Sequence, residues 1–184
     1  MRRGATPLLW LILALIAAPI VWFVAYDIIA FQPRTAEIRR LVAAAAAEEK
    51  SPPDSLRRVL RVSYPNQLSS HVARLLLEEL DAEPMGNSML WWHARRTAWT
   101  GLVDLHLSES DQTTLFLALS PMGNNVRGFS KASTAVLGAP LSALSVEQAA
   151  RLVTVGKAPS IYLNNPDRLT QQSEALAQRA KNAL

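Results

Sequence analysis

Hydrophobic residues follow two different patterns along the chain: a continuous run at the start and a periodic pattern afterwards. Residues 8–26, LLWLILALIAAPIVWFVAY, contain no charged side chain. Nineteen helical residues span ~28 Å, close to the ~30 Å hydrocarbon thickness of a bilayer. Tryptophan and tyrosine lie toward both ends of the run, where aromatic rings favour the membrane–water interface. The pattern predicts one membrane-spanning helix.

A cleaved signal peptide is the alternative interpretation of this segment. Signal peptides have a shorter apolar region that ends at small residues. Ala17 and Ala18 are small, but the apolar run continues well beyond them, so we favour an uncleaved anchor over residues 8–31. The positive-inside rule leaves its orientation undecided, because arginines flank the segment on both sides: Arg2, Arg3, Arg34, Arg39 and Arg40.

Beyond the anchor, apolar positions recur at helical spacing, and capping residues or prolines separate the helices. Ser108 and Ser145 are typical N-cap residues, and Asn87 or Ser88 could cap the helix that follows them. No alternation of apolar and polar residues extends beyond three or four positions. The sequence therefore predicts an all-α fold, with helices over residues 35–50, 52–62, 67–80, 89–107, 109–119, 128–137, 146–155 and 166–184.

The stretch GKAPSIYLNNPDR, residues 156–168, predicts a helix end, a loop and a new helix. Gly156 follows the helical pattern of VEQAARLVTV, where a left-handed cap residue commonly lies. We expect Pro159 and Pro166 to keep the backbone out of a helix until the last element begins. By itself this pattern requires no function, because loops rich in proline and asparagine are common.

Composition and charge exclude several kinds of site. The chain of 184 residues has no cysteine, so it has no disulfide and no thiolate metal ligand. Its net charge of +4 comes from scattered basic residues and not from a basic run, which argues against nucleic acid as a partner. His71, His93 and His106 lack metal-ligand spacing. We therefore expect neither a metal nor a cofactor.

A series of turn and cap residues occurs in fixed register near the C-terminal end. It consists of Gly123-Asn124, Gly128, Gly138, Leu144-Ser145, Ala149-Ala150, Ala158-Pro159-Ser160, Tyr162, Asn165-Pro166 and Arg168. In this series the chain resembles the biosynthetic peptidoglycan transglycosylases, the glycosyltransferase domain of class A penicillin-binding proteins. The resemblance implies a lysozyme-like helical fold. It also implies an activity, the polymerisation of lipid II, a disaccharide carried on a polyprenyl diphosphate.

The resemblance also assigns the acidic residues of the site. In the family, one glutamate is the general base on the acceptor hydroxyl and a second acts on the donor side. Glu48 falls on the base position, Glu49 on the acidic position beside it, and Trp99 on the position of the second glutamate. An indole neither carries a negative charge nor exchanges a proton at neutral pH. The alternative for Glu48 and Glu49 is an ordinary solvated helix end.

Basic and polar residues are assigned to substrate binding in the same way, since cations stabilise the charge of a leaving phosphate. Tyr64-Pro65 and Glu109, in contrast, depart from the family, which has a glycine pair and a lysine at these positions. For the residues next to the Gly123-Asn124 turn, a solvated face is the alternative. The assigned residues are Arg74, Arg95, Arg96, Asn124, Arg127 and Lys131.

Together these features predict a degenerate and shortened transglycosylase-like protein. We expect a cytoplasmic tail (1–7), a transmembrane anchor (8–31) and a helical domain (32–184), which the resemblance places in the periplasm at the inner membrane. The favoured function is a non-catalytic module that binds lipid II, nascent glycan or a cell-wall synthesis protein. The alternatives are an active glycan polymerase that uses Glu48 and a lysozyme-type glycan-cleaving enzyme. The cluster Trp91, Trp92 and Trp99 is either core or a sugar platform.

Overall fold

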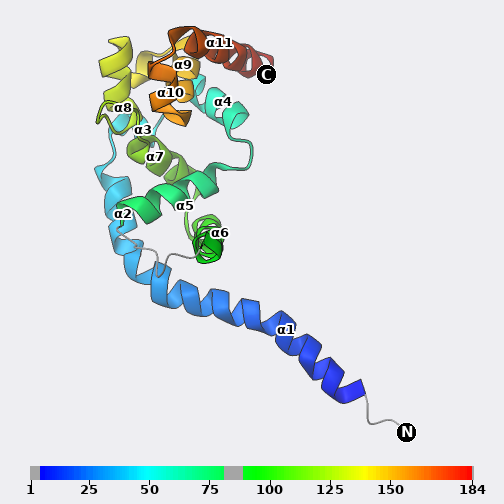
Figure 1. Ribbon diagram of the computed structural model, residues 1–184. Helices are drawn as coiled ribbons and strands as arrows, with labels where there is room; N and C mark the ends of the chain where they lie inside the picture. The colour runs from blue at the N-terminus through cyan, green and yellow to red at the C-terminus, as the bar shows by residue number, and fades with distance from the viewer. Residues whose placement is uncertain (1–4, 81–88, 184) are drawn as a thin grey trace. The chain divides into compact units, whose positions relative to one another are not determined.

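The computed structural model describes residues 5–80 and 89–183, and the regular elements in these ranges are helices (Figure 1). The predicted all-α class is confirmed for this part of the chain. Besides the helices, an isolated bridge pairs Pro121 with Arg127 across a turn. The caps predicted at Asn87 or Ser88 lie outside the described residues. The chain divides into two compact units after Arg39.

The first unit is a long apolar helix. It consists of α1 (Ala5–Tyr26), the π-helical turn η1 (Asp27–Phe31), the 3-10 turn η2 (Gln32–Arg34) and the first part of α2 (Thr35–Ala44). The helical run from Trp10 to Ala44 is long and apolar enough to cross a membrane, and none of its most apolar window is buried. Isolated apolar side chains are normal on a protein surface, but a continuous exposed band of them marks a membrane or partner contact. This run is the candidate transmembrane helix.

The predicted helix 35–50 is wrong in one respect, because it breaks after α2. Ala46 is extended, with φ −60° and ψ 150°, and the short helix α3 (Ala47–Lys50) begins after it. The side chain of Glu49 turns back and accepts a hydrogen bond from the Ala46 N–H at 3.1 Å. The Glu49 N–H in turn donates to the Ala46 carbonyl at 3.0 Å. These two bonds restart the helix in a new direction, which an alanine-rich sequence does not reveal.

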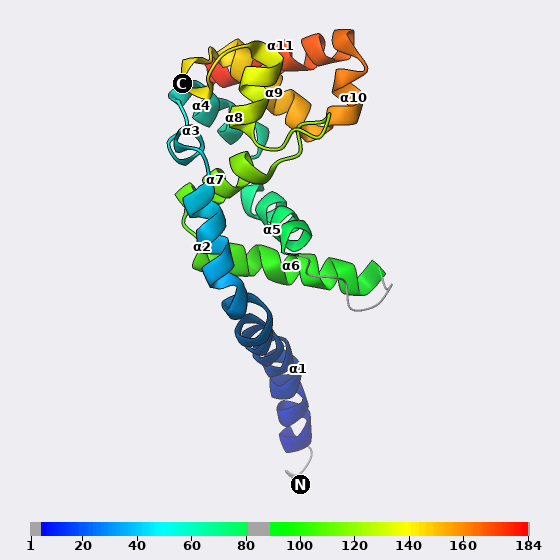
Figure 2. The same ribbon diagram turned by 90° about the vertical axis from the view of Figure 1, so that its left-hand side faces the viewer.

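Three helices of the second unit pack on one another: α4 (Asp54–Ser63), α9 (Val146–Lys157) and α11 (Pro166–Asn182) (Figure 2). The predicted cap Ser145 is confirmed here, and the structure adds a cap that was not predicted, Asn165. Ser145 and Gln148 form a capping box at the start of α9, and Asn165 caps α11. Apolar side chains fill the space between the helices, among them Leu56, Val59, Leu152, Leu169 and Leu176.

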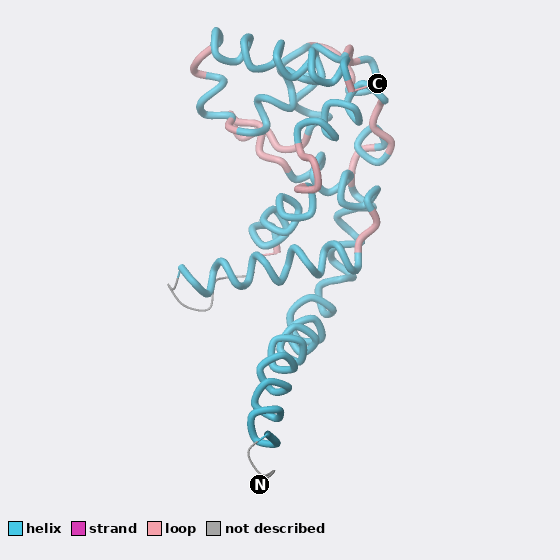
Figure 3. Tube along the Cα trace, turned by 90° about the vertical axis from the view of Figure 1, so that its right-hand side faces the viewer, coloured by secondary structure: helices cyan, strands magenta, loops and turns pink. Residues whose placement is uncertain are grey.

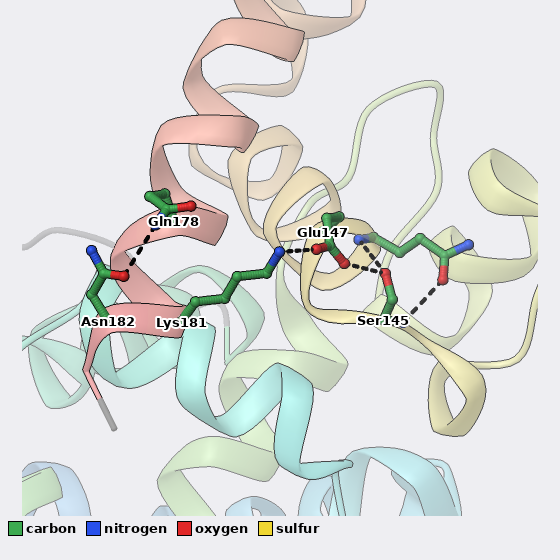
Figure 4. Close-up of polar contacts among 6 residues, drawn as sticks. Ser145, Glu147, Gln178, Lys181 and Asn182 are labelled. Atoms are coloured by element: carbon green, nitrogen blue, oxygen red, sulfur yellow. Dashed lines mark hydrogen bonds and ion pairs between the residues drawn. The ribbon is translucent and has the colours of Figure 1, made fainter.

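An ion pair joins the start of α9 to the end of α11. Lys181 contacts Glu147, and the Ser145 hydroxyl donates to the same carboxylate at 2.8 Å (Figure 4). The hydrogen bond from Lys181 is the main reason that the pKa of Glu147 falls to about 2. Both side chains of the pair are about half exposed, so it aligns the helix ends but adds little stability.

A second group of helices contains α5 (Leu68–Glu79), α6 (Met89–His106) and α7 (Glu109–Leu119). Helix α5 packs against both α6 and α7. Helix α7 begins at Ser108, whose hydroxyl accepts from the Asp111 N–H at 3.1 Å, as predicted. Buried apolar side chains, among them Leu75, Leu76, Leu102 and Leu117, form the core of this group.

Short helices and loops alternate with the long helices (Figure 3). Along the chain, α8 (Phe129–Ala132), η3 (Ser133–Leu137) and η4 (Leu141–Ala143) lie between α7 and α9, and α10 (Pro159–Leu163) joins α9 to α11. The loop predicted after residue 155 is wrong. Gly156 lies inside α9, and Pro159 starts α10, because proline is tolerated at the first helical position. A Cβ on Gly156 would lie 3.3 Å from Met122 Sδ and from Phe129 Cζ, so close packing explains this glycine.

The buried face of α9 generates a stability prediction. Leu152→Ala removes a fully buried side chain and should lower the free energy of unfolding by about 2–5 kcal/mol. The neighbouring Arg151 is exposed, so Arg151→Ala should change that free energy by at most about 0.5 kcal/mol. Denaturant unfolding of the full chain in detergent micelles measures both values. Equal values for the two variants would contradict this packing.

Candidate functional site

The carboxylate of Glu48 accepts four hydrogen bonds from two other segments of the chain. One oxygen accepts from the Ser142 hydroxyl at 2.6 Å and the Ser142 N–H at 3.3 Å. The other accepts from the Leu141 N–H at 3.1 Å and the Ser130 hydroxyl at 3.2 Å. These bonds, the Ser142 hydroxyl first, lower the pKa of Glu48. A general base works best with a pKa near the working pH, so this carboxylate is a weak proton acceptor.

Glu49 is buried beside Glu48 and is also fully engaged. One oxygen accepts from the Ser130 N–H at 3.0 Å, and the other forms the Ala46 cap. Gly128 approaches it closely: a Cβ there would lie 3.0 Å from the Glu49 carboxylate, and the φ of +89° is itself unfavourable for other residues. The two carboxylates therefore fasten α3 to the first turns of α8 and η4.

Two of the predicted arginines are held by neighbouring acids at the end of α5. Arg74 donates to Glu78 on the same helix at 2.6 Å. Arg127 forms an ion pair with Glu79, and its Nε donates to the Leu119 carbonyl at 3.0 Å. Arg127 thus attaches the segment after α7 to the end of α5. Among the described residues, no hydrogen bond or ion pair links these arginines to Glu48 or to its neighbour on α3.

The other two arginines assigned by the resemblance, Arg95 and Arg96, come from α6, which packs against α5. The Arg96 guanidinium lies over the Trp92 ring, 5.5 Å from its centroid, which is a cation–π contact. Arg96 also lines a cavity of about 560 Å³ between α5 and α6, together with His93 and Asp104. Arg95 is half-buried at the adjacent position of the helix.

Around His71, the structure gathers cations from three helices. The His71 ring packs against Tyr64, with 4.8 Å between centroids, and Lys157 Nζ lies 5.3 Å above the same Tyr64 ring. Burial first, and then the charges of Arg74, Arg96 and Lys157, lower the pKa of His71. Sequence reasoning assigned Arg74 and Arg96 but missed Lys157, because no motif connects α9 to α5. We call these three cations the basic cluster.

Asn124 and Lys131 occupy exposed positions. Asn124 is in the left-handed region with φ +50°, a conformation that asparagine tolerates better than most residues. The turn packs against α10: a Cβ on Gly123 would lie 2.5 Å from Leu163 Cδ1. Lys131 lies on α8 and is exposed. A substrate role for either residue stays a prediction.

Trp99 is a core residue. It is fully buried on α6, beside the buried side chains of Ala98, Leu102 and Val103. Trp92, in contrast, is 41% exposed on the same helix. The position at which the resemblance implies a second glutamate therefore points into the hydrophobic core. No acid could sit there without either a new partner or a rearranged core.

Burial of Trp99 generates a prediction about stability. Trp99→Glu should lower the free energy of unfolding by about 3–5 kcal/mol or more, because it leaves both a cavity and a buried charge. Trp92→Glu changes the exposed tryptophan of the same helix and should cost about 1 kcal/mol or less. Denaturant unfolding measures both. A Trp99→Glu protein as stable as the wild type would indicate that position 99 is open to water.

The hydrogen bonds of Glu48 generate a prediction about pH. Its folded-state pKa lies below the usual 4.5, so its contribution to stability is present above pH 4.5 and is lost as the pH falls through the lower, folded-state value. The stability difference between wild type and Glu48→Gln should therefore be larger at pH 7 than at pH 3. Glu174→Gln is the control, because this exposed change should alter the free energy of unfolding by at most about 0.5 kcal/mol. Unfolding curves at the two pH values provide the test, and a constant difference would contradict it.

Comparison with known proteins identifies the family. The transglycosylase family matches residues 87–181, a range that includes Arg95, Arg96 and Trp99 but begins after Glu48 and Glu49. Penicillin-binding protein 1C of Escherichia coli (strain K12) is 34% identical over 117 residues, which make up 62% of this chain and 14% of that protein. No solved structure matches the chain. The resemblance seen in the sequence is confirmed, and the chain belongs to the peptidoglycan transglycosylase family.

Proposed function

We propose that this protein is a membrane-anchored, transglycosylase-like module that binds lipid II or nascent glycan without polymerising it. The position of Trp99 is the observation that carries the proposal. The family uses a second glutamate at this position, whereas this chain has a fully buried indole. Without an acid there, the donor side lacks the group that the family's chemistry requires.

The state of Glu48 supports the same conclusion for the acceptor side. A base must be able to accept a proton from the sugar hydroxyl. The lone pairs of Glu48 are already directed at the hydrogen-bond donors of Ser130, Leu141 and Ser142. Protonation would weaken these bonds and loosen the attachment of α3 to its neighbours. Both positions that carry the family's acid–base chemistry are thus used for structure.

Binding is supported by the basic cluster and by the apolar helix. The charges of Arg74, Arg96 and Lys157 all act on His71, and a diphosphate is a ligand with complementary charge. The helix Trp10–Ala44 would hold the domain at the membrane that contains the polyprenyl carrier. We propose a cytoplasmic tail over residues 1–7, an inner-membrane anchor over 8–31 and a periplasmic domain over 32–184. A cell-wall synthesis protein in the same membrane would then receive the bound substrate.

An assay with fluorescent lipid II tests this function. The full chain in detergent micelles should bind lipid II and release no glycan chains. Arg74→Ala and Arg96→Ala should each weaken binding by about tenfold or more, because each removes a charge-assisted contact. The exposed Arg151→Ala is the matched control and should bind like the wild type.

Glu48→Gln separates the two catalytic alternatives from the binding function. Under our proposal it leaves lipid II affinity unchanged, since Glu48 serves the fold. Glycan chains made by the wild type and absent with Glu48→Gln would establish a polymerase instead. Fragments released from purified peptidoglycan by the wild type, and not by this variant, would establish a glycan-cleaving enzyme.

A further inference from the structure

A second cavity, of about 620 Å³, lies among α4, α5, α6 and α7. It shares Asp104 with the cavity beside Arg96, and its lining includes Tyr64, Pro65 and Glu109, three positions at which this chain departs from the family. Side chains from each of the four helices line it, including Arg61, Ser69, Asp104 and Glu109. Its volume lies within the range of about 300–1,000 Å³ that is typical of small-molecule sites. The charges on its walls indicate what it could bind.

Three charged side chains on this cavity have no partner within the described ranges. Arg61 comes from α4, Asp104 from near the end of α6, and Glu109 from the start of α7. None of the three side chains forms an ion pair or hydrogen bond with another described residue. In contrast, Arg57 on the same wall is paired with Asp54. Charges of both signs therefore face one cavity without neutralising each other.

A ligand complementary to this cavity carries an anion and a cation at separate points. A guanidinium binds a carboxylate through two parallel hydrogen bonds, so Arg61 selects a carboxylate. Asp104 and Glu109 accept hydrogen bonds from an ammonium group. A polyanion would be repelled by Asp104 and Glu109, and a polycation would be repelled by Arg61. The arrangement therefore favours a zwitterionic ligand, such as a short peptide with an amine and a carboxylate.

We propose that this cavity binds the peptide stem of peptidoglycan, with a stem carboxylate on Arg61 and the amine of its diamino acid on Asp104 and Glu109. The identity of the peptide rests on the proposed function, whereas its zwitterionic chemistry rests on the cavity alone. The site is particular to this chain, since Glu109 stands where the family resemblance implies a lysine. It would let the module distinguish glycan with peptide stems from bare glycan.

The experiment measures binding of a synthetic stem tetrapeptide to the full chain in detergent micelles by calorimetry. The peptide has an acetylated N-terminus, one diamino-acid amine and a free C-terminal carboxylate. Amidation of the carboxylate should weaken binding about tenfold or more in the wild type and cause no further loss in Arg61→Ala. Acetylation of the side-chain amine should do the same in the wild type, with no further loss in the double variant Asp104→Asn, Glu109→Gln.

Arg58→Ala is the matched control, because Arg58 is exposed on α4 but does not line the cavity. In this variant, amidation and acetylation of the peptide should weaken binding by the same factors as in the wild type. The proposal would be overturned if the peptide did not bind. It would also be overturned if amidation and acetylation weakened binding as much in the cavity variants as in the wild type. Lipid II binding without stem recognition would remove this inference and leave the proposed function intact. Stem binding without lipid II binding would contradict the proposed function and support the zwitterionic site.

Discussion

The second unit depends on a pair of adjacent carboxylates that hold distant segments together. Glu48 and Glu49 accept hydrogen bonds from Ser130, Leu141 and Ser142, which lie 81 to 94 positions further along the chain. Helices as short as α8 and η4 cannot bury enough apolar surface to fix themselves, so their exposed N–H groups need acceptors. The residues that the family resemblance associates with chemistry therefore also hold the architecture together.

Much of the fold follows from local sequence, because capping is a local interaction. Ser108, Ser145 and Asn165 each start a helix at the predicted position, and their side chains accept from an N–H three residues later. Local sequence fails where distant partners decide. Gly156 resembles a helix end, yet Phe129 and Met122 pack against it inside α9. The break at Ala46 likewise reflects Glu49 and the segments that Glu49 holds.

The candidate site was less predictable than the fold. The absence of an acid at Trp99 could be read from the sequence, but its burial depends on how α6 packs. Lys157 reaches the basic cluster from α9, and Arg61, Asp104 and Glu109 share a cavity from three helices. No spacing in the sequence relates such residues, since their proximity is a property of tertiary packing. The family match begins after Glu48, so resemblance alone leaves that residue's role open.

The close approach of Gly128 to Glu49 has a consequence for how such proteins diverge. A Cβ on Gly128 would crowd both the Glu49 carboxylate and the Ala118 carbonyl, and the carboxylate is held partly by the Ser130 N–H that follows the glycine. Each residue thus restricts the other, and a substitution at one of the two positions should be followed by a substitution at the other. In distant homologues, joint retention or joint loss of this pair would reveal shared architecture even after overall similarity has faded.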